Sequence, residues 1–160
     1  MKEKDQYFRA NAGIVLINER DEVLALERKK IPGAWQLPQG GIRTDEEPME
    51  AAIRELSEET NFNASHVQLV GELPEWLAYE LPAAARSEKT GRGQVQRWFF
   101  FRLIPTAPEV RLTDKAAEEV SAYKWTNLLS LAKEVVAFRR RTYERLASYV
   151  EVELPETRQD

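Results

Sequence analysis

Residues 46–60 restrict the fold of this chain more than any other segment, because they predict a helix with two chemically opposite faces. Glu55, Glu58 and Glu59 are spaced i, i+3 and i+4, so at about 100° per residue they share one side of that helix. The other, mostly apolar side carries Met49, Ala52, Ile53, Leu56 and Thr60. We therefore expect a helix that packs one face against a sheet and presents three carboxylates elsewhere.

The ends of this helix are predicted from residues that favour helix caps. Thr44 or Asp45 can cap its start, and Pro48 is acceptable within a first turn. Asn61 is expected to end the helix, because Asn tolerates the left-handed backbone conformation that a helix stop often needs.

The rest of the chain reads as strands mixed with a few helices, which predicts an α/β layered domain. Apolar or alternating runs indicate strands or extended segments at residues 8–18, 22–26, 35–42, 67–70, 96–103 and 122–125. Helical patterns cover residues 128–136 and 138–150. No repeat, low-complexity tract or linker divides the chain, so we expect one domain over residues 1–160, with an ordered core over about 7–150.

Composition excludes several classes of chemistry. The chain has no cysteine, which excludes disulfides, thiolate catalysis and cysteine metal sites and is compatible with a reducing cytoplasm. His66 is the only histidine, so a multi-histidine zinc site is hard to build. The 27 acidic residues outnumber the 23 basic ones, which argues against binding double-stranded DNA. No apolar run is long enough for a membrane helix, so we expect a cytoplasmic protein without a membrane partner.

The three helical carboxylates favour a cation site. Glu55, Glu58 and Glu59 repel one another unless a divalent ion lies among them, and oxygen-only ligands favour Mg²⁺ or Mn²⁺. A plainer interpretation is a solvated acidic face in which Arg54 and Glu58 form an ordinary surface pair. The glycines at residues 40–41 favour the first interpretation, because they let the backbone approach an ion or a phosphate closely.

The spacing around these glutamates resembles a known family motif. Gly40, five residues, Glu46, seven residues and then the sequence RELSEETNF at residues 54–62 resemble the Nudix box, G-x5-E-x7-R-E-U-x-E-E-x-G-U, where U is a bulky aliphatic residue. Two positions depart from it: Asn61 stands in place of Gly, and Phe62 is aromatic at the last hydrophobic position. The resemblance implies the Nudix fold, an α/β/α sandwich with a mixed central sheet.

The resemblance also implies a reaction. Nudix enzymes hydrolyse a nucleoside diphosphate linked to another group, and divalent ions bridge their glutamates and the phosphates. Carried over, Glu55 and Glu59 are the expected main metal ligands, and Glu58 shares that role or acts as a base. Arg54 would orient a glutamate, the carbonyl of Gln39 or Gly40 would complete the coordination, and Glu46 is expected to be structural. More than one ion is expected with substrate bound.

A longer resemblance points to one subfamily. The sequence WQLPQGGI at residues 35–42 resembles a stretch of the group that contains bacterial RNA 5′ pyrophosphohydrolases and plant-type diadenosine tetraphosphate hydrolases. Gln39 is the discriminating residue, because many other Nudix proteins have Gly in the corresponding P-G-G. Residues 76–82, 93–99 and 135–140 resemble further segments of this group. The group has a metal-binding glutamate near Glu119, so Glu119 is expected to be an extra ligand or a base.

The same segments imply a substrate site. The cations that would grip a polyphosphate are Arg9, Lys29, Arg97 and Arg139. Gln39 and the Tyr79 hydroxyl would also contact substrate, and Phe138 with Val136 would offer an apolar face to a base. Arg9 and Lys29 are equally compatible with plain surface roles. Residues 83–92 match no pattern and are expected to form a mobile loop near the site.

The first functional hypothesis is therefore metal-dependent hydrolysis of a pyrophosphate linkage in a dinucleoside polyphosphate such as diadenosine tetraphosphate. The acidic net charge of −4 favours a small dinucleotide. One alternative is removal of pyrophosphate from triphosphorylated RNA 5′ ends, and another is cleavage of a guanosine tetraphosphate or related alarmone. A hypothesis of a different class, a non-catalytic nucleotide-binding regulator, predicts the loss of a metal-binding carboxylate, yet the carboxylates at residues 55, 58 and 59 are all present.

Overall fold

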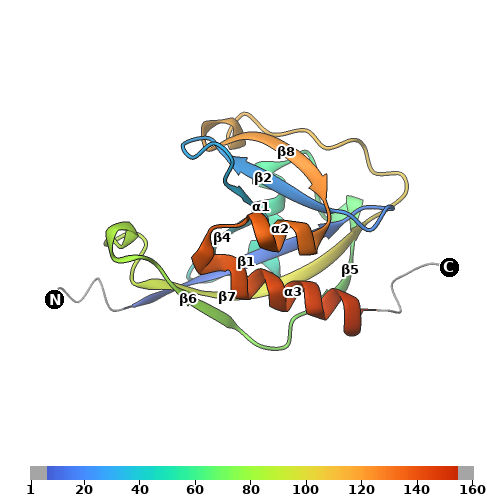
Figure 1. Ribbon diagram of the computed structural model, residues 1–160. Coiled ribbons are helices and arrows are strands. Elements are labelled where there is room, and N and C mark those ends of the chain that lie inside the picture. The colour runs from blue at the N-terminus through green and yellow to red at the C-terminus, as the bar shows by residue number, and fades with distance from the viewer. Residues whose placement is uncertain (1–6, 155–160) are drawn as a thin grey trace.

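One twisted, mixed sheet organises the computed structural model, which describes residues 7–154 (Figure 1). Its strands are β1 Phe8–Ile17, β2 Val23–Arg28, β3 Trp35–Gln36, β4 Gln39–Gly41, β5 Val67–Glu72, β6 Leu77–Glu80, β7 Gly93–Leu103 and β8 Val120–Thr126. The α-helices are α1 Pro48–Glu59, α2 Leu128–Glu134 and α3 Arg140–Val152. The short 3₁₀ helices are η2 Ala64–His66, η3 Ala83–Ala85, η4 Ala116–Glu118 and η5 Ala137–Arg139.

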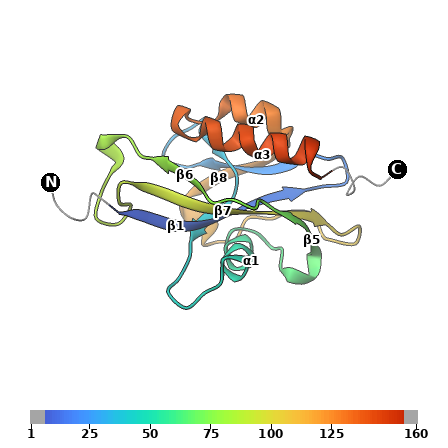
Figure 2. The ribbon, with the colours of Figure 1, turned by 90° about the horizontal axis from the view of Figure 1, so that it is seen from below.

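Strands β1 and β7 form the parallel centre of the sheet, in which Phe8 lies opposite Gly93 and Ile17 opposite Arg102. All other strand pairs are antiparallel, and the main order is β3-β2-β1-β7-β5, with β4 on β1, β6 on β7 and β8 on β2. Helix α1 lies on one face of this sheet, and α2 and α3 lie on the other (Figure 2). This arrangement confirms the predicted α/β/α sandwich with a mixed sheet.

The side chains of β7 show why both faces of the sheet are covered. Trp98 and Phe100 are buried in the core beneath α2 and α3, whereas Phe99 and Phe101 are buried in the core beneath α1. Successive residues of a strand point to opposite faces, so this uninterrupted apolar run needs a helical layer on each side.

The start of α1 differs from the predicted one. The helix begins at Pro48, and its cap is Glu47 rather than Thr44 or Asp45. Pro48 has a backbone φ suited to the first helical turn and no N–H that would need a partner there. The carboxylate of Glu50 accepts a hydrogen bond from the Glu47 N–H at 3.2 Å, which satisfies a backbone group at this helix start.

The expected left-handed stop at Asn61 is wrong. Among residues 7–154, Asp21 is the one non-glycine residue with a positive φ, and α1 ends at Glu59, followed by Thr60 in extended conformation as its cap. Asn61 uses its side chain as a bridge: the amide nitrogen donates to the Glu109 carbonyl at 2.8 Å, and the amide oxygen accepts from the Arg111 N–H at 2.7 Å. Tertiary hydrogen bonds therefore replace the glycine turn of the family motif.

Strand β6 was not predicted, and it matters for the site. It pairs with the first part of β7, so that Tyr79 lies opposite Gln94, while β5 pairs with the last part. Strands β7 and β8 are longer than predicted, and the last helix begins at Arg140, after η5, rather than at residue 138. Within the described residues 7–154, none of the helices combines the length and apolar composition that a membrane crossing requires.

Candidate active site

Five carboxylates from two distant segments line a small cavity of about 100 Å³. Helix α1 supplies Glu55, Glu58 and Glu59, and the segment at η4 supplies Glu118 and Glu119. The η4 segment is held in place by a backbone hydrogen bond of 2.8 Å from the Lys29 N–H to the Glu119 carbonyl. The structure therefore brings Glu119 to the glutamates of α1, as the resemblance implied.

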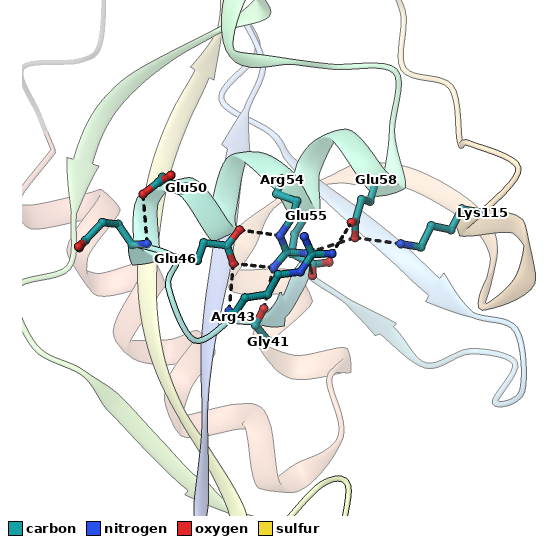
Figure 3. A network of polar contacts seen from close by, with 9 residues as sticks. Gly41, Arg43, Glu46, Glu50, Arg54, Glu55, Glu58 and Lys115 are labelled. Atoms are coloured by element: carbon teal, nitrogen blue, oxygen red, sulfur yellow. Dashed lines mark hydrogen bonds and ion pairs between the residues drawn. The ribbon is translucent and has the colours of Figure 1, made fainter.

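Arg54 is the centre of the polar network on α1 (Figure 3). Its Nε and Nη2 donate to both carboxylate oxygens of Glu46, at 2.7 and 2.9 Å, and Nη2 also donates to the Gly41 carbonyl at 2.8 Å. Its Nη1 donates to Glu55 at 2.8 Å. The hydrogen bonds from Arg54 lower the pKa of Glu46 to about 2, and Glu46 in turn raises the pKa of Arg54. Glu46 is therefore the main hydrogen-bonding partner of Arg54.

Glu58 lies among three cations. Its carboxylate is 3.4 Å from Arg54, 3.6 Å from Arg43 and 3.3 Å from the Nζ of Lys115. In Figure 3, Lys115 lies at one end of the network and points toward the Glu58 carboxylate. Lys115 and Glu118 were not predicted from the sequence, and the one signal that pointed to this segment was the resemblance that singled out the neighbouring Glu119.

Glu59 and Glu55 are the carboxylates most affected by burial. Burial, with the charges of Glu55, Glu119 and Glu58, raises the pKa of Glu59 to about 8, and burial also raises the pKa of Glu55. The Oε2 atom of Glu59 is buried and has no hydrogen-bond partner within residues 7–154. A buried acceptor without a donor is costly, so this atom is suited to bind a proton, a water molecule or a cation.

The residues of this cavity fit a hard divalent cation. The five carboxylates offer only oxygen donors, although Lys115 also lines the cavity. Glu59 has an unpartnered oxygen, and a Cβ at Gly40 would lie 1.9 Å from the carboxyl carbon of Glu55. In residues 7–154, however, no three acidic or histidine side chains already converge as a finished metal cage. Arg54 contacts only the Oε1 atom of Glu55, so Oε2 is left for an ion, whereas both oxygens of Glu58 lie within 3.6 Å of cationic side chains.

A second cluster lies on the α3 side of the sheet, where Tyr79, Phe138 and Arg139 meet. The rings of Tyr79 and Phe138 are 5.4 Å apart, and the Arg139 guanidinium lies 5.5 Å from the centre of each ring. Arg139 is only 7% exposed, and its Nη1 has no hydrogen-bond partner among the described residues. A buried guanidinium with an unused donor suits an anionic group of a ligand.

Buried amides adjoin this cluster. The Nε2 of Gln96 donates to Asn11 at 2.9 Å and also contacts the Oε1 of Gln39, and the Tyr79 hydroxyl donates to Gln94 at 2.6 Å. Gln94 and Gln96 belong to the motif at residues 93–99, and neither was assigned a role from the sequence. The network holds the side chain of Gln39 on the α3 side of the sheet.

Strand β4 connects the two clusters. Gln39 points to the amides on the α3 side, while the next residue, Gly40, lies against Glu55 on the α1 side. Adjacent strand residues point to opposite faces, so Gln39 and Gly40 face different clusters. The carboxylates and the amides of the second cluster therefore lie on opposite faces of the sheet, against adjacent residues of β4.

Two further residues that were predicted to contact the substrate, Arg9 and Lys29, lie at different places in the fold. Arg9 packs against Gly41 and donates to the Lys89 carbonyl of the 83–92 loop at 3.4 Å, which puts it beside β4. Lys29 is exposed, and its Nζ donates to the Ala117 carbonyl at 3.1 Å, close to Glu119.

The sequence also predicted substrate contacts for Val136 and Arg97. The Val136 side chain is exposed, two residues before Phe138. Arg97 pairs with Glu72 of β5 and lies 5.5 Å from the centre of the Trp76 ring. The structure therefore directs Arg97 toward the β5 edge of the sheet and does not bring it to the carboxylates.

Comparison with known proteins agrees with this geometry. The NUDIX domain family matches residues 7–146, so the chain belongs to the Nudix family. An RNA pyrophosphohydrolase of Acidiphilium cryptum (strain JF-5) is 42% identical over 146 residues, covering 88% of each chain. The chain is accordingly a Nudix hydrolase that acts on pyrophosphate bonds, and enzymes of this family generally need divalent metal ions.

Solved structures show the same fold. The E. coli dihydroneopterin triphosphate pyrophosphohydrolase matches with a TM-score of 0.70 and 21% identity, over 89% of this chain and 99% of the other. A C. elegans Ap4A hydrolase, solved as a binary complex, matches with a TM-score of 0.66 and 22% identity, over 89% of this chain and 98% of the other.

Proposed function

We propose that this enzyme removes pyrophosphate from triphosphorylated RNA 5′ ends in a reaction that depends on Mg²⁺. The observation that carries the proposal is the arrangement at β4, where the carboxylate cavity of Glu55 and Glu59 and the cluster of Tyr79, Phe138 and Arg139 lie against adjacent residues on opposite faces of the sheet. A phosphate chain can then reach the carboxylates while its nucleoside end lies on the rings. The relative at 42% identity bears the name of an RNA pyrophosphohydrolase, which favours this substrate.

The acidic residues would hold the metal. Glu55, Glu58, Glu59, Glu119 and the Gly40 carbonyl are the ligands that we propose for Mg²⁺, or for Mn²⁺ in its place, with more than one ion bound beside substrate. When bound, the ions neutralise charge on the phosphoryl oxygens and activate water for attack on phosphorus. Water adds across one P–O–P linkage, that bond breaks, and each product keeps a phosphate.

The protein's own contribution is to position these carboxylates. Arg54 holds Glu55 through Nη1 while Glu46 fixes the opposite side of the same guanidinium, so the Glu55 carboxylate has a defined orientation before substrate binds. Arg54 thereby acts as a positioning residue. A fixed carboxylate loses less entropy when a ligand arrives, which favours a well-formed site.

The nucleoside end would bind at the second cluster. Phe138 and Val136 offer an apolar face for a base, and stacking on an aromatic ring contributes about 1–3 kcal/mol. Arg139 and Tyr79 would bind a phosphate, together with Gln39 of β4. Arg9 and Lys29, which flank the carboxylates at β4 and η4, would add charge along the phosphate chain. Arg97, paired with Glu72, retains a substrate role only if that ion pair opens.

The second candidate is a dinucleoside polyphosphate such as diadenosine tetraphosphate. The net charge of −4 favours a small substrate over a long polyanion, and one protein of the same fold is an Ap4A hydrolase. Both substrates present the same pyrophosphate linkage and one nucleoside end to the site. They differ at both ends of the phosphate chain. Triphosphorylated RNA ends in a free terminal phosphate and continues as a polynucleotide beyond the sugar, whereas diadenosine tetraphosphate carries a second adenosine on its fourth phosphate and only hydroxyl groups on its sugars.

A side-by-side assay tests the proposal. Triphosphorylated RNA, diadenosine tetraphosphate, ADP-ribose and guanosine tetraphosphate are supplied with Mg²⁺ or Mn²⁺, and the products are identified. We expect triphosphorylated RNA to have the highest kcat/KM with Mg²⁺ and to yield a monophosphorylated end. A tenfold preference for diadenosine tetraphosphate would select the second candidate instead. A Glu59→Gln protein, which loses a proposed ligand, is the control for contaminating hydrolases.

A further inference from the structure

Strand β8 is an edge of the sheet, and its outer side has no partner strand. Within the described residues 7–154, β8 pairs with β2 alone, and in Figure 1 it lies beyond β2. An unpaired edge presents backbone N–H and C=O groups to which another chain can pair. Lys124, the only cation of β8, does not shield this edge, because its side chain pairs with Glu134 of α2 at 2.8 Å. The irregularity in the pairing of β8 lies near Arg28, at its other end.

The backbone groups that face outward belong to Tyr123 and Trp125. The N–H of Arg28 donates at 2.9 Å to the carbonyl of the residue before β3, so it points away from β8. Successive residues of a strand direct their N–H groups to alternate sides, so Ala25 points its N–H toward β8, where it lies opposite Lys124. The residues on either side of Lys124 therefore direct their N–H and C=O groups away from β2.

A groove of about 540 Å³ adjoins this edge on the α1 face of the sheet. The side chains of Tyr123 and Trp125 line it, together with residues of the turn at 18–22 and of the segment 108–110. Tyr123 is 41% exposed, whereas Trp125 is half-buried against the core beneath α1. A strand added to β8 would place every second side chain next to these two rings and over the groove.

The groove carries a negative charge. Three carboxylates and one guanidinium line it, those of Glu19, Glu22, Glu109 and Arg20. Glu22 accepts a hydrogen bond from the Asn18 amide at 3.2 Å, and none of the three carboxylates forms an ion pair with any described residue. Aromatic rings also attract cations to their faces. Both properties favour a cationic side chain in the groove and disfavour the phosphates of an RNA.

We propose that β8 and this groove bind an extended, positively charged segment of a partner protein. The segment pairs antiparallel with β8 through the outward groups of Tyr123 and Trp125, and lysine or arginine side chains at alternate positions lie in the groove. Main-chain hydrogen bonds supply affinity, and the carboxylates supply selectivity for a basic sequence. The groove shares no residue with the carboxylate cavity, so the inference goes beyond the proposed function and does not depend on it.

A ten-residue peptide of alternating lysine and valine tests the charge requirement. Binding of the fluorescently labelled peptide to the full chain is measured by anisotropy, with an alternating glutamate–valine peptide as control. We expect a Kd below about 100 µM for the lysine peptide, and no saturable binding of the glutamate peptide. Equal affinity for the two peptides, or no binding of the lysine peptide, would overturn the inference.

Methylation of the peptide backbone tests the strand pairing. In an antiparallel pair, residues directly opposite each other share a face, so lysines opposite Tyr123 and Trp125 would donate their own N–H groups to these two residues. Methylating the lysine backbone nitrogens should therefore weaken binding about 10-fold or more, whereas methylating those of the valines, which point away from β8, should weaken it less than threefold. Equal losses in the two methylated peptides would contradict pairing at this edge.

A pair of double variants locates the binding surface. Glu19→Gln with Glu109→Gln removes two charges from the groove, and Glu144→Gln with Glu151→Gln makes the same change on exposed positions of α3. We expect the groove variant to bind the lysine peptide at least about 5-fold more weakly and the α3 variant to match wild type. Equal affinity in the two variants would overturn the inference. A dimer in light scattering that the groove variant dissociates would do so too, because the occupant would then be a second copy of this chain.

Discussion

A Cβ atom at Gly40 would lie 1.9 Å from the carboxyl carbon of Glu55 and 2.1 Å from its Oε1. Strand β4 and helix α1 therefore meet so closely that a side chain at residue 40 would collide with the Glu55 carboxylate in its present position. The Glu55 carboxylate occupies the space that a side chain at residue 40 would take, so the first glycine of the motif is explained by contact with a functional group rather than by its φ angle.

Gly40→Ala should therefore displace Glu55. We expect the protein to fold but to bind Mn²⁺ at least about 5-fold more weakly, since crowding of this kind costs about 1–3 kcal/mol. Titration calorimetry measures the affinity, and circular dichroism checks the fold. Gly41→Ala is the matched control, because its Cβ would meet the Arg9 guanidinium, whose nearest atom at 2.6 Å can move aside. Equal Mn²⁺ affinity in wild type and Gly40→Ala would contradict the role given to this contact.

Glu59→Gln should abolish most of the activity and leave the fold intact. The variant keeps the shape of the side chain but loses the negative charge that we propose for binding the ion. We expect kcat to fall at least about 100-fold with triphosphorylated RNA and saturating Mg²⁺. Glu144→Gln, an exposed glutamate of α3, makes the same charge change away from the site. Wild-type rates in the Glu59 variant would remove Glu59 from the catalytic site.

The pKa of Glu59 also predicts how stability depends on pH in the absence of metal. Because this pKa is raised from 4.5 to about 8, the folded state binds more protons than the unfolded state between those values. The free energy of unfolding should therefore fall as pH rises from about 5 to 8, and remain constant with respect to this group below pH 4. At pH 8, Glu59→Gln should be more stable than wild type by roughly 1–3 kcal/mol.

Urea unfolding in EDTA at pH 5 and pH 8 measures this difference. Saturating Mg²⁺ should reverse the order at pH 8, because the ion binds the ionised carboxylate of the wild type and stabilises its folded state. Parallel pH profiles for the two proteins in EDTA would show that Glu59 does not titrate in this range.

Phe138→Ala should weaken binding of the nucleoside end. The Phe138 ring lies 5.4 Å from that of Tyr79 and is partly exposed, so it can take a base on its open side. We expect affinity for a nucleoside triphosphate analogue to fall about 5- to 100-fold, and affinity for inorganic tripolyphosphate to change by less than twofold. Leu129→Ala, an exposed residue of α2, serves as control. Equal losses for both ligands would argue against stacking.

The helix of the Nudix box shows how far the sequence could predict the site. The positions of Glu55, Glu58 and Glu59 on one face follow from helical geometry, which is local and needs no knowledge of the rest of the chain. The helix ends were harder to predict. The stop near Asn61 depends on hydrogen bonds to residues 109 and 111, about fifty positions away, and those partners are invisible in the local sequence.

Arg28 and Arg97 show the limit for single charged residues. Both are arginines on strands, and the resemblance singled out only Arg97, which proves to be paired with Glu72. The side chain of Arg28 forms no hydrogen bond or ion pair in the described residues, and Arg28 lies opposite Val120, the residue after Glu119. The difference arises from which strand lies next to each residue and in which register, and neither is encoded within a few positions of the arginine.

The sequence by itself thus determined the family, the α/β architecture and the acidic face of α1, because residue spacing directly specifies which side chains share a helix face or a strand face. Only the tertiary structure decided that Glu119 would join Glu59 and that Tyr79 would meet Phe138. Those contacts join residues about sixty positions apart. They depend on the pairing of β2 with β8 and of β6 with β7, whose register is set by the burial of whole strands rather than by any local motif.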